Sequence, residues 1–86
     1  MLGITFKSLP KNYRKELSGV KPNTVRKVLI DDERYNFLRA RVEGKALGGY
    51  ITIEQAGEPM HSSFTRYITD VSYWEGLFII SWRHKE

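Results

Sequence analysis

Three side chains that can hydrogen-bond an anion lie within six residues of one another. Lys21, Thr24 and Arg26 carry an ammonium, a hydroxyl and a guanidinium group. Ammonium and guanidinium groups make strong, charge-assisted hydrogen bonds to phosphates and carboxylates. On an extended strand Thr24 and Arg26 project from one face, and Val25 projects from the other. We therefore predict that Lys21, Thr24 and Arg26 face a common pocket, in which Arg26 is the main anion contact.

The residues around these side chains predict a loop that leads into a strand. Gly19 suits the end of a helix, because glycine adopts a left-handed backbone without a Cβ clash. Pro22 cannot donate a backbone hydrogen bond, which favours a loop. The run from Thr24 to Ile30 is rich in β-branched residues, as is typical of a strand. Lys21 is thus expected on the loop, and Arg26 on the strand that follows it.

Seven elements are expected along the chain from apolar periodicity and turn residues. They are strands over Gly3–Lys7, Thr24–Ile30, Tyr50–Glu54, Ser63–Val71 and Leu77–Trp82, and helices over Pro10–Leu17 and from Asp31 to Gly44. Ser8 is expected to cap the first helix, Asp31 the second, and Leu17 to lie on the apolar edge of the first. The continuous apolar run Leu77–Trp82 predicts a strand buried on both faces. Five short strands and two helices fit a small closed barrel, and an open α+β sandwich also fits this order.

The stretch Gly19-x-Lys21-x-x-Thr24-x-Arg26 resembles the signature of ASCH domains, a branch of the PUA-like fold. The elements around it are also similar, with a strand and a helix over Ile4–Leu17 before it and a strand after it. The region Tyr50–Trp82, with three strand-like runs, is similar to the barrel of that family. The start Ile4-Thr5-Phe6 resembles the small bacterial 4-acetylcytidine amidohydrolases. The resemblance implies an α+β fold in one domain, residues 1–86, with a small PUA-like five-stranded β-barrel and two short helices.

The resemblance also implies a cleft between the first helix, the signature loop and the barrel. In ASCH-like amidohydrolases the signature lysine and threonine act with a later glutamate on an acyl amide, and the matching positions are Lys21 and Thr24. A desolvated lysine can serve as the base that a threonine nucleophile needs. The glutamate lies in a segment that this chain lacks. Glu75, in an expected turn over residues 73–76, is the best remaining candidate, and Glu54 is the second.

Further ligand contacts are expected from aromatic and basic side chains. Trp74, Tyr73 and Tyr50 offer flat faces on which a base can stack. Arg66 stands on an otherwise apolar strand face, so it points either toward the cleft or outward with its head in water. Aromatic side chains at strand ends also serve as core packing.

The positive charge is concentrated around the signature. Residues 1–29 hold seven basic side chains and one acid, a balance of +6, and residues 30–86 hold seven basic and nine acidic ones, a balance of −2, which together give +4. Lys11, Arg14 and Lys15 are expected on the outer face of the first helix. This asymmetry favours an anionic partner, nucleic acid first. The alternative is a solvated basic helix face.

The composition restricts the class of protein and of site. A chain of 86 residues with 41% apolar residues predicts one folded domain with a small core. The chain contains no cysteine, and His61 and His84 lack the spacing of metal ligands, so neither a metal nor another cofactor is expected. No signal peptide and no apolar run of about 18 residues is found, and a cytoplasmic protein is expected.

Three functions follow from these observations as hypotheses. The first is a module that binds RNA or a modified nucleoside through the basic cleft around Gly19–Arg26. The second is an amidohydrolase that acts on an acylated cytidine with Lys21 and Thr24. The third is a phage or mobile-element protein that binds and inhibits a host protein. A carboxylate within reach of Lys21 would favour the enzyme over the binding module, and the oligomeric state stays open.

Overall fold

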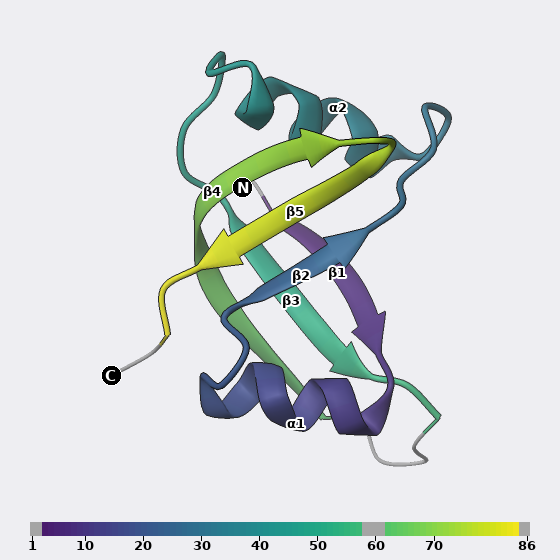
Figure 1. The fold of residues 1–86 in the computed structure, drawn as a ribbon, viewed down its shortest axis with the longest axis vertical. Helices are drawn as coiled ribbons and strands as arrows, with labels where there is room; N and C mark the ends of the chain where they lie inside the picture. Colours follow the sequence, from purple (N-terminus) through teal and green to yellow (C-terminus); the bar gives the residue numbers. More distant parts are fainter. Residues whose placement is uncertain (1–2, 58–61, 85–86) are drawn as a thin grey trace.

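The computed structural model describes residues 3–57 and 62–84, which form five strands and two helices (Figure 1). In chain order these are β1 (Gly3–Ser8), α1 (Pro10–Ser18), β2 (Asn23–Arg26), α2 (Glu33–Val42), β3 (Tyr50–Gln55), β4 (Ser63–Trp74) and β5 (Leu77–Trp82). The predicted number, order and type of elements are confirmed. Neither of the described helices is long and apolar enough to span a bilayer.

The five strands form one mixed sheet in the order β1-β3-β4-β5-β2. The β1–β3 pair is parallel, and the other three pairs are antiparallel. The long strand β4 serves both halves of the sheet, because it pairs with β3 before a register shift at Ile68/Asp70 and with β5 after it. Such an irregularity bends a strand. The sheet consequently curls into a half-barrel, with α1 and α2 at its opposite ends (Figure 1).

The predicted closure of the barrel is wrong. Strands β1 and β2 are the two edges of the sheet, and no ladder joins them within the described residues. Strand β2 contains only four residues, because its partner β5 begins at Leu77, directly beyond the Arg26–Phe78 pair. The predicted strand to Ile30 therefore ends at Arg26, and Leu29 and Ile30 are exposed in a loop.

The core lies inside the half-barrel and follows the alternation of the strands. Ile51 and Ile53 of β3 and Ile80 of β5 are fully buried, and Leu38 of α2 closes one end. Strand β5 alternates buried and less buried residues, so the prediction of burial on both faces is wrong. Of its other residues, Leu77 is exposed, and Ile79 and Ser81 are partly buried.

Three expectations at the helices are also corrected. Helix α1 has Leu9 at its N-cap without a side-chain hydrogen bond, since the Ser8 hydroxyl bonds elsewhere. Helix α2 is capped by Asp32, not by Asp31. On α1, Leu17 is 41% exposed, whereas Glu16 is buried beside the core. The next section describes what holds that carboxylate.

Candidate functional site

A small pocket opens between the end of β1, helix α1 and strand β2. Its volume is about 260 Å³. The residues that line it are Lys7, Ser8, Leu9, Asn12, Glu16, Lys21, Thr24, Val25 and Arg26. The prediction that Lys21, Thr24 and Arg26 face a common pocket is thus confirmed, and we call it the signature pocket.

A buried carboxylate stands at the wall of the signature pocket. Glu16 is 1% exposed. The Ser8 hydroxyl donates to its Oε1 over 2.8 Å, and Lys21 Nζ lies 3.8 Å from its Oε2. Buried carboxylates need such partners, because desolvation of a charge is costly. The carboxylate within reach of Lys21 therefore comes from α1.

The end of α1 brings Lys21 back over the helix. Gly19 has a φ of +89°, in the left-handed region, and its N–H donates to the Glu16 carbonyl. A Cβ there would lie 2.7 Å from Nδ1 of His84, so the position requires glycine for two reasons. The backbone N–H of Lys21 then donates to the Lys15 carbonyl over 3.1 Å. This turn sets Lys21 beside Glu16.

Arg26 connects the pocket to the edge of β1. Its Nε donates to the Thr24 hydroxyl over 2.9 Å, one terminal nitrogen donates to the Lys7 carbonyl over 2.8 Å, and the other donates to the Ser8 hydroxyl over 2.7 Å. The guanidinium also lies over the Phe6 ring, 5.0 Å from its centroid. Burial lowers the pKa of Arg26, nearby Glu16 opposes this effect, and Arg34 adds to it. All three hydrogen-bond partners are neutral, and Arg26 forms no ion pair within the described residues.

The pocket can therefore bind a ligand with both donors and an acceptor. A guanidinium has five N–H donors, and the three hydrogen bonds of Arg26 leave two of them. Lys21 adds an ammonium that is 36% exposed. The Glu16 carboxylate lines the wall as an acceptor, but it is 1% exposed and already holds the Ser8 hydroxyl and Lys21. Val25 and Leu9 give the pocket an apolar rim. A planar ligand with acceptors beside a donor, such as a base edge, matches this set.

Several predicted site residues lie elsewhere. Glu75 is exposed in the turn between β4 and β5, and Trp74, 67% exposed, directly precedes it; neither lines the signature pocket. The turn is shorter than predicted because β4 extends to Trp74. Tyr50 and Tyr73 do not line the pocket either. Glu54, the second candidate glutamate, lines a neighbouring groove.

The other predicted basic residues fall into two groups. Lys11, Arg14 and Lys15 are exposed on α1, as expected, but do not line the signature pocket. Arg66 is 8% exposed and points neither into this pocket nor into water. Its terminal nitrogens donate to the carbonyls of Thr65 and Leu17. Arg66 therefore ties β4 to the end of α1, which is a structural role.

Ser8, Asn12 and Glu16 were not identified from the sequence as residues of the pocket. Tyr13 and Glu16 are three residues apart on α1 and share its buried face. A glutamate on the buried stripe of a short helix was the available signal. Ser8 carried no comparable signal, because its partner lies eight residues away.

A second groove, of about 430 Å³, adjoins the signature pocket and shares Lys7 and Arg26 with it. It follows the open seam between the edges β1 and β2, and we call it the seam groove. The residues that line it are Thr5, Phe6, Lys7, Arg26, Lys27, Arg34 and Glu54. The seam groove thus holds four basic side chains and one acidic side chain.

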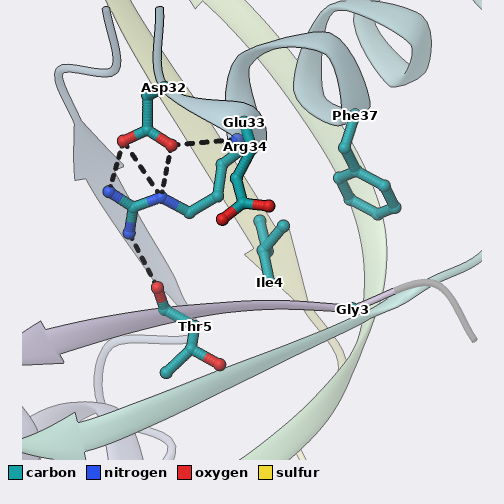
Figure 2. Close-up of a pocket in the computed structure, with 7 residues that line it drawn as sticks. All are labelled: Gly3, Ile4, Thr5, Asp32, Glu33, Arg34 and Phe37. Carbon is teal, nitrogen blue, oxygen red and sulfur yellow. Dashed lines mark hydrogen bonds and ion pairs between the residues drawn. The ribbon is translucent and has the colours of Figure 1, made fainter.

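A third pocket, of about 610 Å³, lies beyond Arg34 and is lined by Gly3, Ile4, Thr5, Asp32, Glu33, Arg34 and Phe37. Figure 2 shows the Arg34 guanidinium between the Asp32 carboxylate and the Thr5 carbonyl. Side-chain and backbone hydrogen bonds from Arg34 lower the pKa of Asp32 to about 2. The same side-chain bond raises the pKa of Arg34. The charge of Arg34 is therefore neutralised locally.

Within the described residues, no group of three His, Asp or Glu side chains is arranged to hold a metal ion. His61 lies outside the described residues. The chain matches no model of a known protein family, and no curated protein matches it. The resemblance to ASCH domains therefore rests on the signature residues and on the order of the elements around them.

Proposed function

We propose that this protein is a small ASCH-like, PUA-like module that binds RNA or a modified nucleoside in the signature pocket. The observation that carries the proposal is that Lys21, Thr24 and Arg26 line one pocket, where the Arg26 guanidinium forms no ion pair within the described residues. Exposed Lys11, Arg14 and Lys15 on α1 extend the positive surface beside it. Such a surface attracts the phosphate backbone of nucleic acids.

The size and the polarity of the pocket favour a single base as the bound group. Small-molecule sites commonly measure about 300–1,000 Å³, and the signature pocket, at about 260 Å³, is slightly smaller than this range. Glutamate accepts from the exocyclic amine of cytosine in nucleic-acid recognition. Lys21 and Arg26 can donate to the acceptors on the same base edge. A cytidine-like base therefore fits the donor and acceptor set best.

Calorimetric titration with cytidine, 4-acetylcytidine and an octamer of cytidine ribonucleotides, at low and high salt, tests the proposal. We expect Lys21→Gln to weaken binding by about tenfold or more, since one charged hydrogen bond contributes roughly 1.5–3 kcal/mol. Lys45→Gln is the matched control, because Lys45 is paired with Glu43 and lines neither the pocket nor the seam groove. Absence of binding by the unmodified protein at low salt would contradict the proposal.

A second candidate function is hydrolysis of the acyl amide of an acylated cytidine. The observation that favours it is the buried Glu16 carboxylate 3.8 Å from Lys21 Nζ, since a lysine that serves as a base needs a positioning partner. In this mechanism Lys21 acts in its neutral amine form, and the Thr24 oxygen attacks the acyl carbon as its proton passes to that amine. The C–N bond then breaks, the amine leaves with a proton from Lys21, and water hydrolyses the acyl–threonine ester.

Release of acetate from 4-acetylcytidine tests the second candidate. Lys21→Gln, Thr24→Val and Glu16→Gln should each remove most of the turnover, and circular dichroism should show that each variant is folded. Glu75→Gln is the control, because Glu75 lies outside the pocket. Turnover by the unmodified protein no faster than in buffer would exclude this function and leave the binding module intact.

A further inference from the structure

We infer that the seam groove is a phosphate subsite, so that the ligand is a nucleotide and not a free nucleoside. The inference rests on the proposed function, because it takes the signature pocket as the site of the base. The seam groove adjoins that pocket through the shared residues Lys7 and Arg26. A base in the pocket would therefore place its phosphate in the groove.

The charges of the seam groove favour an anion. Lys7, Lys27, Arg26 and Arg34 line it against the single acid Glu54. Arg34 is neutralised by Asp32, which leaves three cations that form no ion pair within the described residues, with one carboxylate among them. Lys7 and Lys27 are exposed at the mouth of the groove. The groove thus retains positive charge that no ion pair among the described residues neutralises.

The geometry of Arg26 supports the same conclusion. Half-burial lowers its pKa, which means that its surroundings compensate its charge incompletely. Its partners are two hydroxyls and one carbonyl, and each of these leaves the charge in place. Two N–H groups remain beyond the three that it uses. An anion in the groove would supply the missing counter-charge through charge-assisted hydrogen bonds.

Phosphodiester is the anion that this arrangement fits. The unpaired cations of the groove come from β1, from β2 and from the residue that follows β2, so they stand on both sides of the seam. A small anion such as chloride needs only one of these cations. A nucleotide whose base occupies the signature pocket presents its phosphate to several of them. Phosphate contacts of this kind position a nucleic acid, and base contacts specify it.

Titration of cytidine, its 5′- and 3′-monophosphates and the cytidine octamer into the full chain tests the inference. Wild-type protein should bind at least one monophosphate or the octamer tenfold or more tightly than cytidine. The double variant Lys7→Gln/Lys27→Gln should lose this gain. The single variant Lys27→Gln should bind cytidine unchanged, because Lys27 lines the seam groove and not the signature pocket. For the octamer, two lost phosphate contacts should lower the salt slope by about 1.4, which corresponds to roughly 25-fold weaker binding at 0.1 M salt. Tighter binding of a monophosphate identifies a free nucleotide, and tighter binding of the octamer alone identifies a strand.

The control is the double variant Lys45→Gln/Arg83→Gln, which removes the same charge from positions that line neither site. It should leave the salt slope within about 0.3 of the wild-type value. Equal wild-type affinity for cytidine, its monophosphates and the octamer would overturn the phosphate subsite and leave the proposed function standing. An equal loss in both double variants would also overturn the subsite, because the effect would then come from net charge. Failure of cytidine and of the octamer to bind wild-type protein would remove the proposed function and the inference with it.

Discussion

Arg26 and Arg34 both donate hydrogen bonds to the open edge of β1, but only Arg34 is paired with a carboxylate. Both guanidiniums lie over the Phe6 ring, 5.0 and 4.2 Å from its centroid. Both donate to carbonyls of the unpaired edge of β1, Arg26 to Lys7 over 2.8 Å and Arg34 to Thr5 over 2.7 Å. Arg34 also pairs with Asp32, whereas Arg26 has hydroxyls in that place.

The difference separates two features of the seam: the hydrogen bonds to β1, which both arginines make, and an unpaired positive charge, which remains only on Arg26. One hydrogen bond from a guanidinium satisfies each edge carbonyl. An arginine that is also paired with a nearby carboxylate makes this bond and adds no net charge to the seam. The partners of Arg26 are Thr24 and Ser8, two buried hydroxyls, so the charge at this end persists. A charge at a pocket that no local ion pair neutralises is typical of a binding site.

The largest expected effect separates the two arginines by stability. Arg26→Met should lower the free energy of unfolding by about 2–3 kcal/mol, because it leaves the buried hydroxyls of Thr24 and Ser8 without a donor. Arg34→Met should cost about 1 kcal/mol, since water can reach the groups it leaves. Urea unfolding of both variants measures the difference. Equal costs, or the reverse order, would show that the two ends of the seam are equivalent.

The next effect concerns the hydroxyl that joins Arg26 to Glu16. Ser8→Ala removes the donor to the buried Glu16 carboxylate and the acceptor for Arg26, so we expect a loss of about 1–3 kcal/mol. Ser18→Ala is the control, because its hydroxyl makes an exposed bond to the Lys15 carbonyl; it should cost less than about 0.5 kcal/mol. Thermal or urea unfolding gives both values. A Ser8 variant as stable as the Ser18 variant would mean that water replaces the lost bond.

The ends of the two helices offer a matched pair of glycines. Gly19 and Gly44 both have positive φ, but only at Gly19 would a Cβ meet another side chain, that of His84. Gly44→Ala should therefore cost about 1 kcal/mol from backbone strain alone, and Gly19→Ala about 2 kcal/mol. In a His84→Ala background the cost of Gly19→Ala should fall to that of Gly44→Ala. If the background leaves it unchanged, His84 does not pack on Gly19 in solution.

The smallest effect is the pH dependence at the Arg34 end. The pKa of Asp32 is lowered from 3.8 to about 2 by Arg34, so the folded state favours the charged form. The stabilisation is fully present above about pH 4 and is lost as the pH falls through 2. Asp32→Asn keeps the helix cap and removes the charge. The difference in unfolding free energy between wild type and this variant should shrink as the pH falls from 4 to 2 and vanish below about pH 2, and a constant difference from pH 6 to 2 would contradict the pairing.

Much of the fold was predictable because its signals are local. Apolar periodicity predicted strand β3, and the glycine and proline of the signature predicted the loop before β2. Spacing on a strand placed Thr24 and Arg26 on one face, and the short loop before the strand kept Lys21 near them. Each of these inferences needs only a few neighbouring residues.

The remaining features depend on partners that are distant in the sequence. Strand β2 ends at Arg26 because β5 begins where it does, and no propensity of Leu29 or Ile30 reveals this. The burial of Glu16 depends on Ser8 and Lys21 together. The open seam could not be inferred either, because a pattern of strands does not specify whether the first and last edges meet.

The strand order also sets the sequence of events in folding. The edge strand β1 pairs with β3, and Gly3 and Tyr50 are 47 residues apart (50 − 3); β2 pairs with β5, and Arg26 and Phe78 are 52 apart (78 − 26). Closing such long loops carries an entropic cost before any contact offsets it. The hairpin of β4 and β5, joined by two residues, has no such delay. We expect β4 and β5 to form a template onto which both edges dock last, so during synthesis β2 stays unpaired until residues 77–82 have been made. Pulse-labelling hydrogen exchange should protect the amides of β4 and β5 before those of β1 and β2, and simultaneous protection would instead indicate one concerted step.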